Sequence, residues 1–200
     1  MARASAAFLA LFAFLIAHAA SAAPITVRAF LDGPSEATPN ASPGTGTALV
    51  TFDSVAHTMQ VDVSFADLIG TTTAAHIHCC IAPPGVAGVA SQTPSFVGFP
   101  LGVTGGTYSE LFDMTLASSF NPAFVTGNGG TVAAAEAALF AGLLAGTAYF
   151  NIHTTAFPAG EIRGFFLEVV PEPEPLALFA LGLAVLILSR HLRRNQTIPG

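Results

Sequence analysis

The chain has 200 residues, of which only 9% are charged, and its formal net charge is −6. It contains no lysine, and between Arg28 and Arg190 the only Lys or Arg is Arg163. Because such a chain offers almost no positive charge to phosphates, nucleic-acid binding is excluded. Low charge together with many Thr, Ser, Gly and Ala residues is typical of exported β-rich proteins rather than of disordered ones.

The first 23 residues have the pattern of a cleavable secretion signal. Arg3 gives a positive start, residues 8–17 are an unbroken apolar run, and Ala20, Ser21 and Ala22 are small residues at a cut site. The apolar run is short for a membrane span, which favours a signal over the alternative of a retained anchor. We therefore expect a mature chain that begins near Pro24.

Residues 24–169 are expected to form one β-rich domain. Met59, Val61 and Val63 alternate with polar residues, as on a strand with one buried face, and a turn of four residues connects this strand to a similar one before it. The expected strands cover residues 25–31, 47–53, 57–65, 73–78, 107–116, 147–154 and 161–169. Short strands separated by Gly and Pro turns predict an all-β fold, an antiparallel β-sandwich or barrel of about seven or eight strands.

One helix is expected within this domain, near residues 132–145. Thr131 is a good N-cap, Gly146 suits the residue beyond the helix end, and the leucines between them form an apolar face. Since Glu136 is its only charge, the helix should be covered by the sheet; a helix lying on a membrane surface is the alternative. The Gly/Pro-rich loop at residues 83–100 is long enough to suggest a role in function.

Three histidines are the best candidates for a binding site. Alternate residues of a strand share a face, so His76 and His78 point the same way, and His153 shares a face with Tyr149 and Asn151. If the two strands are neighbours, the three imidazoles converge. Neutral imidazoles at this spacing suit Zn or Cu. The alternative is a structural role, in which the rings bond to backbone and to Glu161.

Cys79 and Cys80 are adjacent and have no other cysteine to pair with. In an oxidising compartment they could form a vicinal disulfide, stay free, or supply Cys80 as a fourth ligand beside the histidines. Such a disulfide closes almost no loop, so it cannot brace the fold. Further along the chain, Glu161 and Arg163 share a strand face and are expected to form a structural ion pair, with an anion site as the alternative.

No set of residues predicts an enzyme. The chain lacks the nucleophile, metalloprotease and phosphate-binding motifs, and its sparse acids show no glycosidase pair. We therefore expect no catalytic residues and no enzymatic activity.

The C-terminal residues 170–200 read as a second sorting segment. Prolines make residues 170–175 extended, and the apolar run 176–189 spans only ~21 Å as a helix, short of a ~30 Å hydrocarbon core. The arginines that follow should stay on the cytoplasmic side. A briefly tethered domain with an accessible linker is expected, and a permanent single-span transmembrane helix is the alternative.

This tail closely resembles the PEP-CTERM sorting signal of Gram-negative bacteria. The matching residues are Val170, Pro171, Glu172 and Pro173, the apolar run, and Arg190, Arg193 and Arg194. The resemblance implies recognition by an exosortase-type transpeptidase, removal of the tail, and transient membrane association through residues 176–189. It also implies a location in the periplasm, on the outer surface or in the extracellular matrix. The six residues after Arg194 depart from the pattern, in which the tail is usually shorter.

Residues 25–168 are similar to the CHRD domain first described in chordin. The similarity is carried by an ordered set of segments, residues 29–33, 44–52, 74–78, 146–154 and 157–164. It implies an extracellular all-β domain with binding as its usual proposed activity. The cysteine pair and the long loop after His78 depart from the animal pattern, and the growth-factor role found in animals does not transfer.

The sequence thus predicts a secreted, non-enzymatic domain that binds an unknown surface or matrix ligand and needs no cofactor. The alternative is a metal-binding protein in which His76, His78 and His153 hold Zn or Cu, and a redox protein is one form of this alternative.

Overall fold

The computed structural model describes residues 23–169 and, beyond them, only Phe179, Leu183 and Leu186. Eight strands form one sheet: β1 (Ile25–Asp32), β2 (Thr45–Asp53), β3 (Thr58–Ala66), β4 (Thr72–His78), β5 (Gly106–Asp113), β6 (Tyr149–Thr154), β7 (Ile162–Phe165) and β8 (Leu167–Glu168). Between β5 and β6 lie a short 3-10 turn (Ala117–Ser119) and two helices, α1 (Pro122–Gly127) and α2 (Val132–Leu144).

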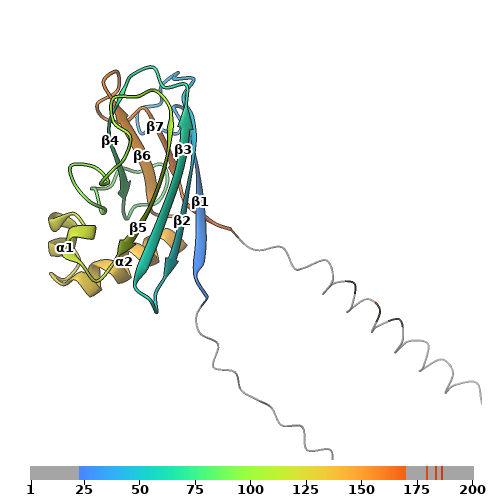
Figure 1. Ribbon diagram of the computed structural model, residues 1–200, viewed down its shortest axis with the longest axis vertical. Coiled ribbons are helices and arrows are strands. Elements are labelled where there is room, and N and C mark those ends of the chain that lie inside the picture. Colours follow the sequence, from blue (N-terminus) through green and yellow to red (C-terminus); the bar gives the residue numbers. More distant parts are fainter. Residues whose placement is uncertain (1–22, 170–178, 180–182, 184–185, 187–200) are drawn as a thin grey trace, which may run out of the picture.

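The sheet has the order β4-β6-β7-β1-β2-β3-β5, and β8 pairs with β1 beside β7. Every pairing between strands is antiparallel. The sheet curls into a half-barrel, with β1, β2 and β3 on one side and β4 and β6 on the other (Figure 1). The all-β, antiparallel fold with one principal helix that the sequence predicts is confirmed, and the strands belong to a single curled sheet.

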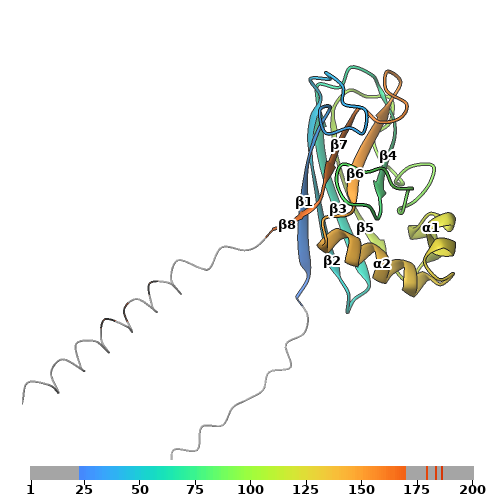
Figure 2. The same ribbon diagram turned by 180° about the vertical axis from the view of Figure 1, so that it is seen from behind.

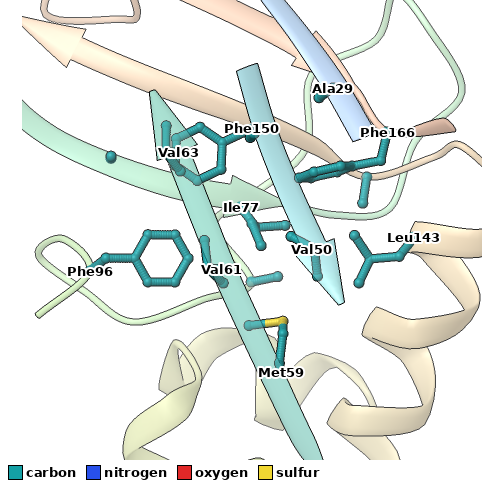
Figure 3. Close-up of a cluster of buried hydrophobic side chains, with 14 of the residues drawn as sticks. Ala29, Val50, Met59, Val61, Val63, Ile77, Phe96, Leu143, Phe150 and Phe166 are labelled. Carbon is teal, nitrogen blue, oxygen red and sulfur yellow. The ribbon is translucent and has the colours of Figure 1, made fainter. Parts of the chain in front are cut away.

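Alternation along the strands explains why the sheet curls around a core. In β3 the side chains of Met59, Val61 and Val63 are buried and the intervening residues are more exposed. These side chains meet Val50 of β2 and, from the opposite wall, Ile77 and Phe150 (Figure 3). Burial of these apolar side chains is the main force that holds the two walls together.

Helix α2 closes one end of the half-barrel, at the bottom of the views in Figures 1 and 2. Its N-cap is Thr131, whose side chain accepts a hydrogen bond from the Ala134 N–H, and Gly146 beyond its end has φ +67°. Phe140 stacks on Phe52 of β2, and Leu139 and Leu143 are fully buried. The predicted helix is confirmed, and it is covered by the sheet as expected.

The long segment between β4 and β5 protects the free edge of β4. Backbone N–H groups of Ala90 and Phe96 donate to carbonyls of this strand, and the hydroxyls of Ser91 and Ser95 accept from its N–H groups. An uncovered edge would expose these groups to pairing with other chains. The segment therefore completes the wall that β4 begins.

The two predicted sorting segments lie outside the described residues, apart from three tail positions, Phe179, Leu183 and Leu186, each of which is helical. Within the described part of the chain, no helix has the length and apolar character needed to cross a membrane.

Candidate functional site

The outer face of β4, β6 and β7 is largely buried, like the inner face. Inward-facing Ile77, Phe150 and Ile162 belong to the core, so their neighbours in each strand point outward, yet four consecutive residues of β6 are buried. Three loops cover this outer face: residues 33–40, 79–96 and 155–160. Their carbonyl groups accept hydrogen bonds from the outward-facing side chains. The covered outer face is rich in polar groups, which is unusual for a buried layer.

His76, His78 and His153 come together on this face. Strands β4 and β6 are neighbours, with His76 opposite Asn151 and His78 opposite Tyr149 in the register. The ring centroids of the three histidines are 5.2 to 5.9 Å apart, and one ring nitrogen from each lies within 4.8 Å of those of the other two. The structure therefore places all three predicted candidates in one group, which we call the trihistidine cluster.

Hydrogen bonds fix the tautomer of each ring in the cluster. His76 Nε2 lies 2.7 Å from the Pro94 carbonyl oxygen, His78 Nδ1 lies 2.9 Å from that of Ala87, and His153 Nδ1 lies 3.0 Å from that of Pro158. A carbonyl can only accept, so each of these nitrogens carries the proton. The second nitrogen of a neutral imidazole then presents a lone pair.

The second nitrogens have no partner. Among the described residues, His76 Nδ1, His78 Nε2 and His153 Nε2 are buried without a hydrogen bond. Protein groups therefore satisfy only one nitrogen of each ring. Three unpaired lone pairs on rings this close together are the kind of donor set that binds a metal ion, and the carbonyls on the other ring nitrogens correspond to outer-shell acceptors.

The electrostatics of the cluster favour neutral rings. Burial lowers the pKa of all three histidines, and for His78 it lowers the pKa to about 4. The carbonyl acceptors oppose this effect, and mutual repulsion of the protonated rings adds to it for His76 and His78. At neutral pH the imidazoles are thus unprotonated, the form that binds a metal.

Two more unpaired acceptors lie on the same face. Glu36 Oε1 and Asn151 Oδ1 are buried without a partner. They lie together under Gly160, because a Cβ atom built there would come within 2.6 Å of both. Burial raises the pKa of Glu36 to about 7, although the charge of Arg163 and an N–H bond from Ala37 oppose the rise. Asn151 is the cross-strand neighbour of His76, so its amide borders the trihistidine cluster, and Glu36 lies next to that amide on the side of Arg163.

Arg163 holds the covering loops in place. Its guanidinium donates to the carbonyls of Ser35, Pro84 and Gly85, and it stacks on Tyr149, with 5.0 Å from Cζ to the ring centroid. The expected ion pair between Glu161 and Arg163 is not present. Arg163 Nε instead lies 3.9 Å from Glu36 Oε2, and both side chains are almost fully buried. Because the guanidinium of Arg163 is buried, it offers no open binding site to an anion.

Glu161 has a separate role in the sheet. Its carboxylate accepts hydrogen bonds from the hydroxyls of Ser42 and Thr154 and from the N–H groups of Ile69 and Gly70. The side chain therefore joins three loops to the end of β6 and makes no contact with the histidines. The sequence pattern predicted that Glu161 and Arg163 share a strand face. Strand β7 begins only at Ile162, so Glu161 lies before the strand and does not follow its alternation.

Cys80 does not belong to the cluster. Strand β4 ends at His78, the chain leaves the sheet, and Cys79 and Cys80 form a disulfide with each other. Cys80 Sγ is 3.6 Å from the Ala138 carbonyl oxygen of α2, and Cys80 is not one of the residues whose ligand atoms group together with those of the histidines. The expectation that Cys80 is a fourth ligand is therefore wrong for the oxidised chain, and the disulfide alternative is the one observed.

A surface pocket of about 430 Å³ lies over this region. Its lining includes Glu36, Val86, Pro158 and Gly160. Val86 precedes the Ala87 carbonyl that holds His78, and the Pro158 carbonyl holds His153. The pocket therefore adjoins the loops whose carbonyl groups accept hydrogen bonds from His78 and His153, and Glu36 forms part of its wall.

Glu36 is the residue of this site that the sequence did not indicate. It lies in an irregular loop, 127 positions from Arg163, its partner in the folded chain, and no periodic pattern marks it. The only feature of the sequence that could have drawn attention to Glu36 is the small number of acidic residues in the chain.

Fold and site together define a class of protein: an all-β domain with a curled antiparallel sheet and a buried polar site on its outer face. The chain belongs to the CHRD domain family, whose model matches residues 27–166. Neither the curated proteins nor the solved structures include a match to this chain. The similarity read from the strand segments is therefore confirmed for the central domain.

Proposed function

We propose that this chain is an exported, non-enzymatic binding protein whose ligand is a Zn or Cu ion held by His76, His78 and His153. Membership of the CHRD family supports an extracellular, binding-type domain. The single observation that supports the metal is the set of three buried imidazole nitrogens left without partners in one cluster.

The geometry of the cluster suits an ion of this size. Two imidazole nitrogens on one tetrahedral Zn ion lie roughly 3.4 Å apart. One ring nitrogen from each histidine lies within 4.8 Å of those of the other two, so a movement of about 1 Å by each would bring these three nitrogens to a common centre. Nitrogen ligands without carboxylates favour Zn or Cu over Ca or Mg.

We also propose that the ends of the chain direct export and sorting. The N-terminal pattern supports cleavage near Pro24, and the tail supports recognition at Pro171, Glu172 and Pro173 by an exosortase-type transpeptidase. The protein would then remain in the periplasm, on the outer surface or in the extracellular matrix of a Gram-negative bacterium.

The metal proposal is tested by thermal unfolding of the full-length chain, first with a chelator and then with added Zn or Cu. At a free metal concentration of 100 times Kd, binding should stabilise the folded state by about 2.7 kcal/mol. In His78→Ala this stabilisation should disappear, because two imidazoles remain and one lone pair is lost. Elemental analysis of the purified protein should show about one equivalent of metal per chain, since one ion fills the cluster.

His57→Ala is the matched control, because His57 lies outside the cluster and pairs with Glu136. It should keep the full metal-dependent shift, whatever its own stability. An equal shift in His78→Ala, or none in the parent with either metal, would contradict the proposal.

A further inference from the structure

The trihistidine cluster supplies only three ligands. Within the described part of the chain, no other His, Cys, Asp or Glu joins the group. Structural zinc sites are normally closed by four protein ligands, whereas sites with three keep a position for water or another small ligand. The fourth coordination position of the ion therefore needs a ligand from outside this group of side chains.

The two remaining unpaired acceptors indicate which kind of molecule fits this fourth position. Of the five buried side-chain atoms without a partner in the described residues, three are the histidine nitrogens and the other two are Glu36 Oε1 and Asn151 Oδ1. Both are oxygens, and a molecule that satisfies both must donate two hydrogen bonds. A water molecule bound to a metal through its oxygen has two protons to donate, so it meets this requirement.

The positions of the two acceptors agree with this role. Asn151 lies between Tyr149 and His153 on the outward face of β6 and opposite His76 on β4, so its amide borders the cluster. Glu36 Oε1 lies beside that amide under Gly160, and Arg163 holds the other carboxylate oxygen at 3.9 Å. Gly160 has φ +136° and any side chain there would collide with both acceptors, so the space beside them depends on a glycine.

The pocket over the site reaches one of the two acceptors, Glu36. Glu36 and Gly160 are part of its lining, and Pro158 in the same wall holds His153. Its walls are otherwise mostly apolar, with Val86, Phe157 and Pro158 among them. A small molecule or anion can reach this wall without unfolding the sheet.

This inference rests on the proposed metal site. We infer that the bound ion keeps an exchangeable fourth ligand, a water molecule that donates hydrogen bonds to Glu36 and Asn151. Small anions that enter from the pocket can replace this water molecule. The centre is thus an open metal site rather than a closed structural one. The ligand class is a small monodentate donor, water at rest and an anion on exchange.

The test uses the full-length chain loaded with Co²⁺, which occupies imidazole sites and has visible absorption bands that report its ligands. Sodium azide is titrated into the parent. We expect a saturable change in the bands as azide replaces water. In Glu36→Gln, which keeps the size of the side chain but removes its charge, the water is held less firmly, and azide should bind about tenfold more tightly.

Asn151→Leu provides a second variant in case Glu36→Gln does not fold, and it should tighten azide binding by about threefold, since a neutral hydrogen bond is lost. Glu136→Gln is the matched control: Glu136 is a buried glutamate on α2 that pairs with His57, and its azide affinity should equal that of the parent.

The outcomes separate the two proposals. Failure of Co²⁺ to bind, with Zn and Cu also without effect, would overturn the metal site and this inference with it. Co²⁺ bands that depend on His78 but do not respond to azide would leave the metal site standing and show that its fourth position is closed. Equal azide affinity in the parent, Glu36→Gln and Asn151→Leu would show that these two residues do not hold the fourth ligand.

Discussion

At the scale of single residues, two buried glutamates show opposite behaviour. Glu36 has an unpaired oxygen, and burial raises its pKa to about 7. Glu161 is fully buried as well, and burial alone would raise its pKa. Hydrogen bonds from Ser42, Thr154, Ile69 and Gly70 outweigh that effect and lower its pKa below 4.5. The two pKa values shift in opposite directions because the two carboxylates accept different numbers of hydrogen bonds. Glu161, with four donors, is a structural residue, whereas Glu36 keeps an unpaired oxygen at the candidate site.

Glu161→Gln should destabilise the domain by more than about 3 kcal/mol, because four buried donors lose a charged acceptor and the amide turns an N–H₂ group toward some of them. Chemical denaturation measures this loss. Glu110→Gln makes the same chemical change on an exposed residue of β5 and should alter stability by less than about 0.5 kcal/mol.

The pH dependence of Glu161 follows from its lowered pKa. Below the unfolded-state pKa of about 4.5 the unfolded chain binds more protons than the folded one, so stability falls as pH falls through the folded-state value. The parent should therefore lose stability below about pH 4.5 more steeply than Glu161→Gln. Parallel pH profiles of the two proteins would contradict the assignment.

At the scale of elements, α2 and the segment after β4 depend on one glycine. Gly142 lies inside α2, and a Cβ atom there would collide with the sulfur atoms of both Cys79 and Cys80. The glycine lets the disulfide pack directly on the helix. A helix interior otherwise disfavours glycine by roughly 1 kcal/mol relative to alanine, so the contact must outweigh this preference.

Gly142→Ala should thus destabilise the protein by about 1–2 kcal/mol despite the better helix propensity of alanine, because an overfilled contact costs roughly 1–3 kcal/mol. Gly127→Ala is the matched control, since Gly127 also lies in a helix and has open space around it. It should be neutral or slightly stabilising. A stabilising Gly142→Ala would show that the packing of the disulfide on α2 is looser than the structure indicates.

At the scale of the whole molecule, the folded domain lies between two segments whose sequences predict proteolytic removal, an N-terminal secretion signal and a C-terminal sorting segment. Intact-mass analysis of the natural exported product should show a chain that begins near Pro24 and lacks the residues beyond the Pro171-Glu172-Pro173 region. Retention of residues 176–194 in the mature protein would favour a permanent anchor. The domain should bind metal equally before and after processing, because the cluster lies wholly within residues 76–153.

The sequence by itself determined the parts of this protein that depend on local periodicity. Alternation predicted most strands and the shared face of the histidines within each strand, because side-chain direction within an element follows from backbone geometry. The cap at Thr131 predicted the start of α2. Only the tertiary structure decided which side chains meet. It paired β4 with β6, assigned Arg163 to Glu36 rather than Glu161, and turned Cys80 away at the end of β4. Those outcomes depend on irregular loops that fold back from distant parts of the chain, and such loops carry no period from which their contacts can be read.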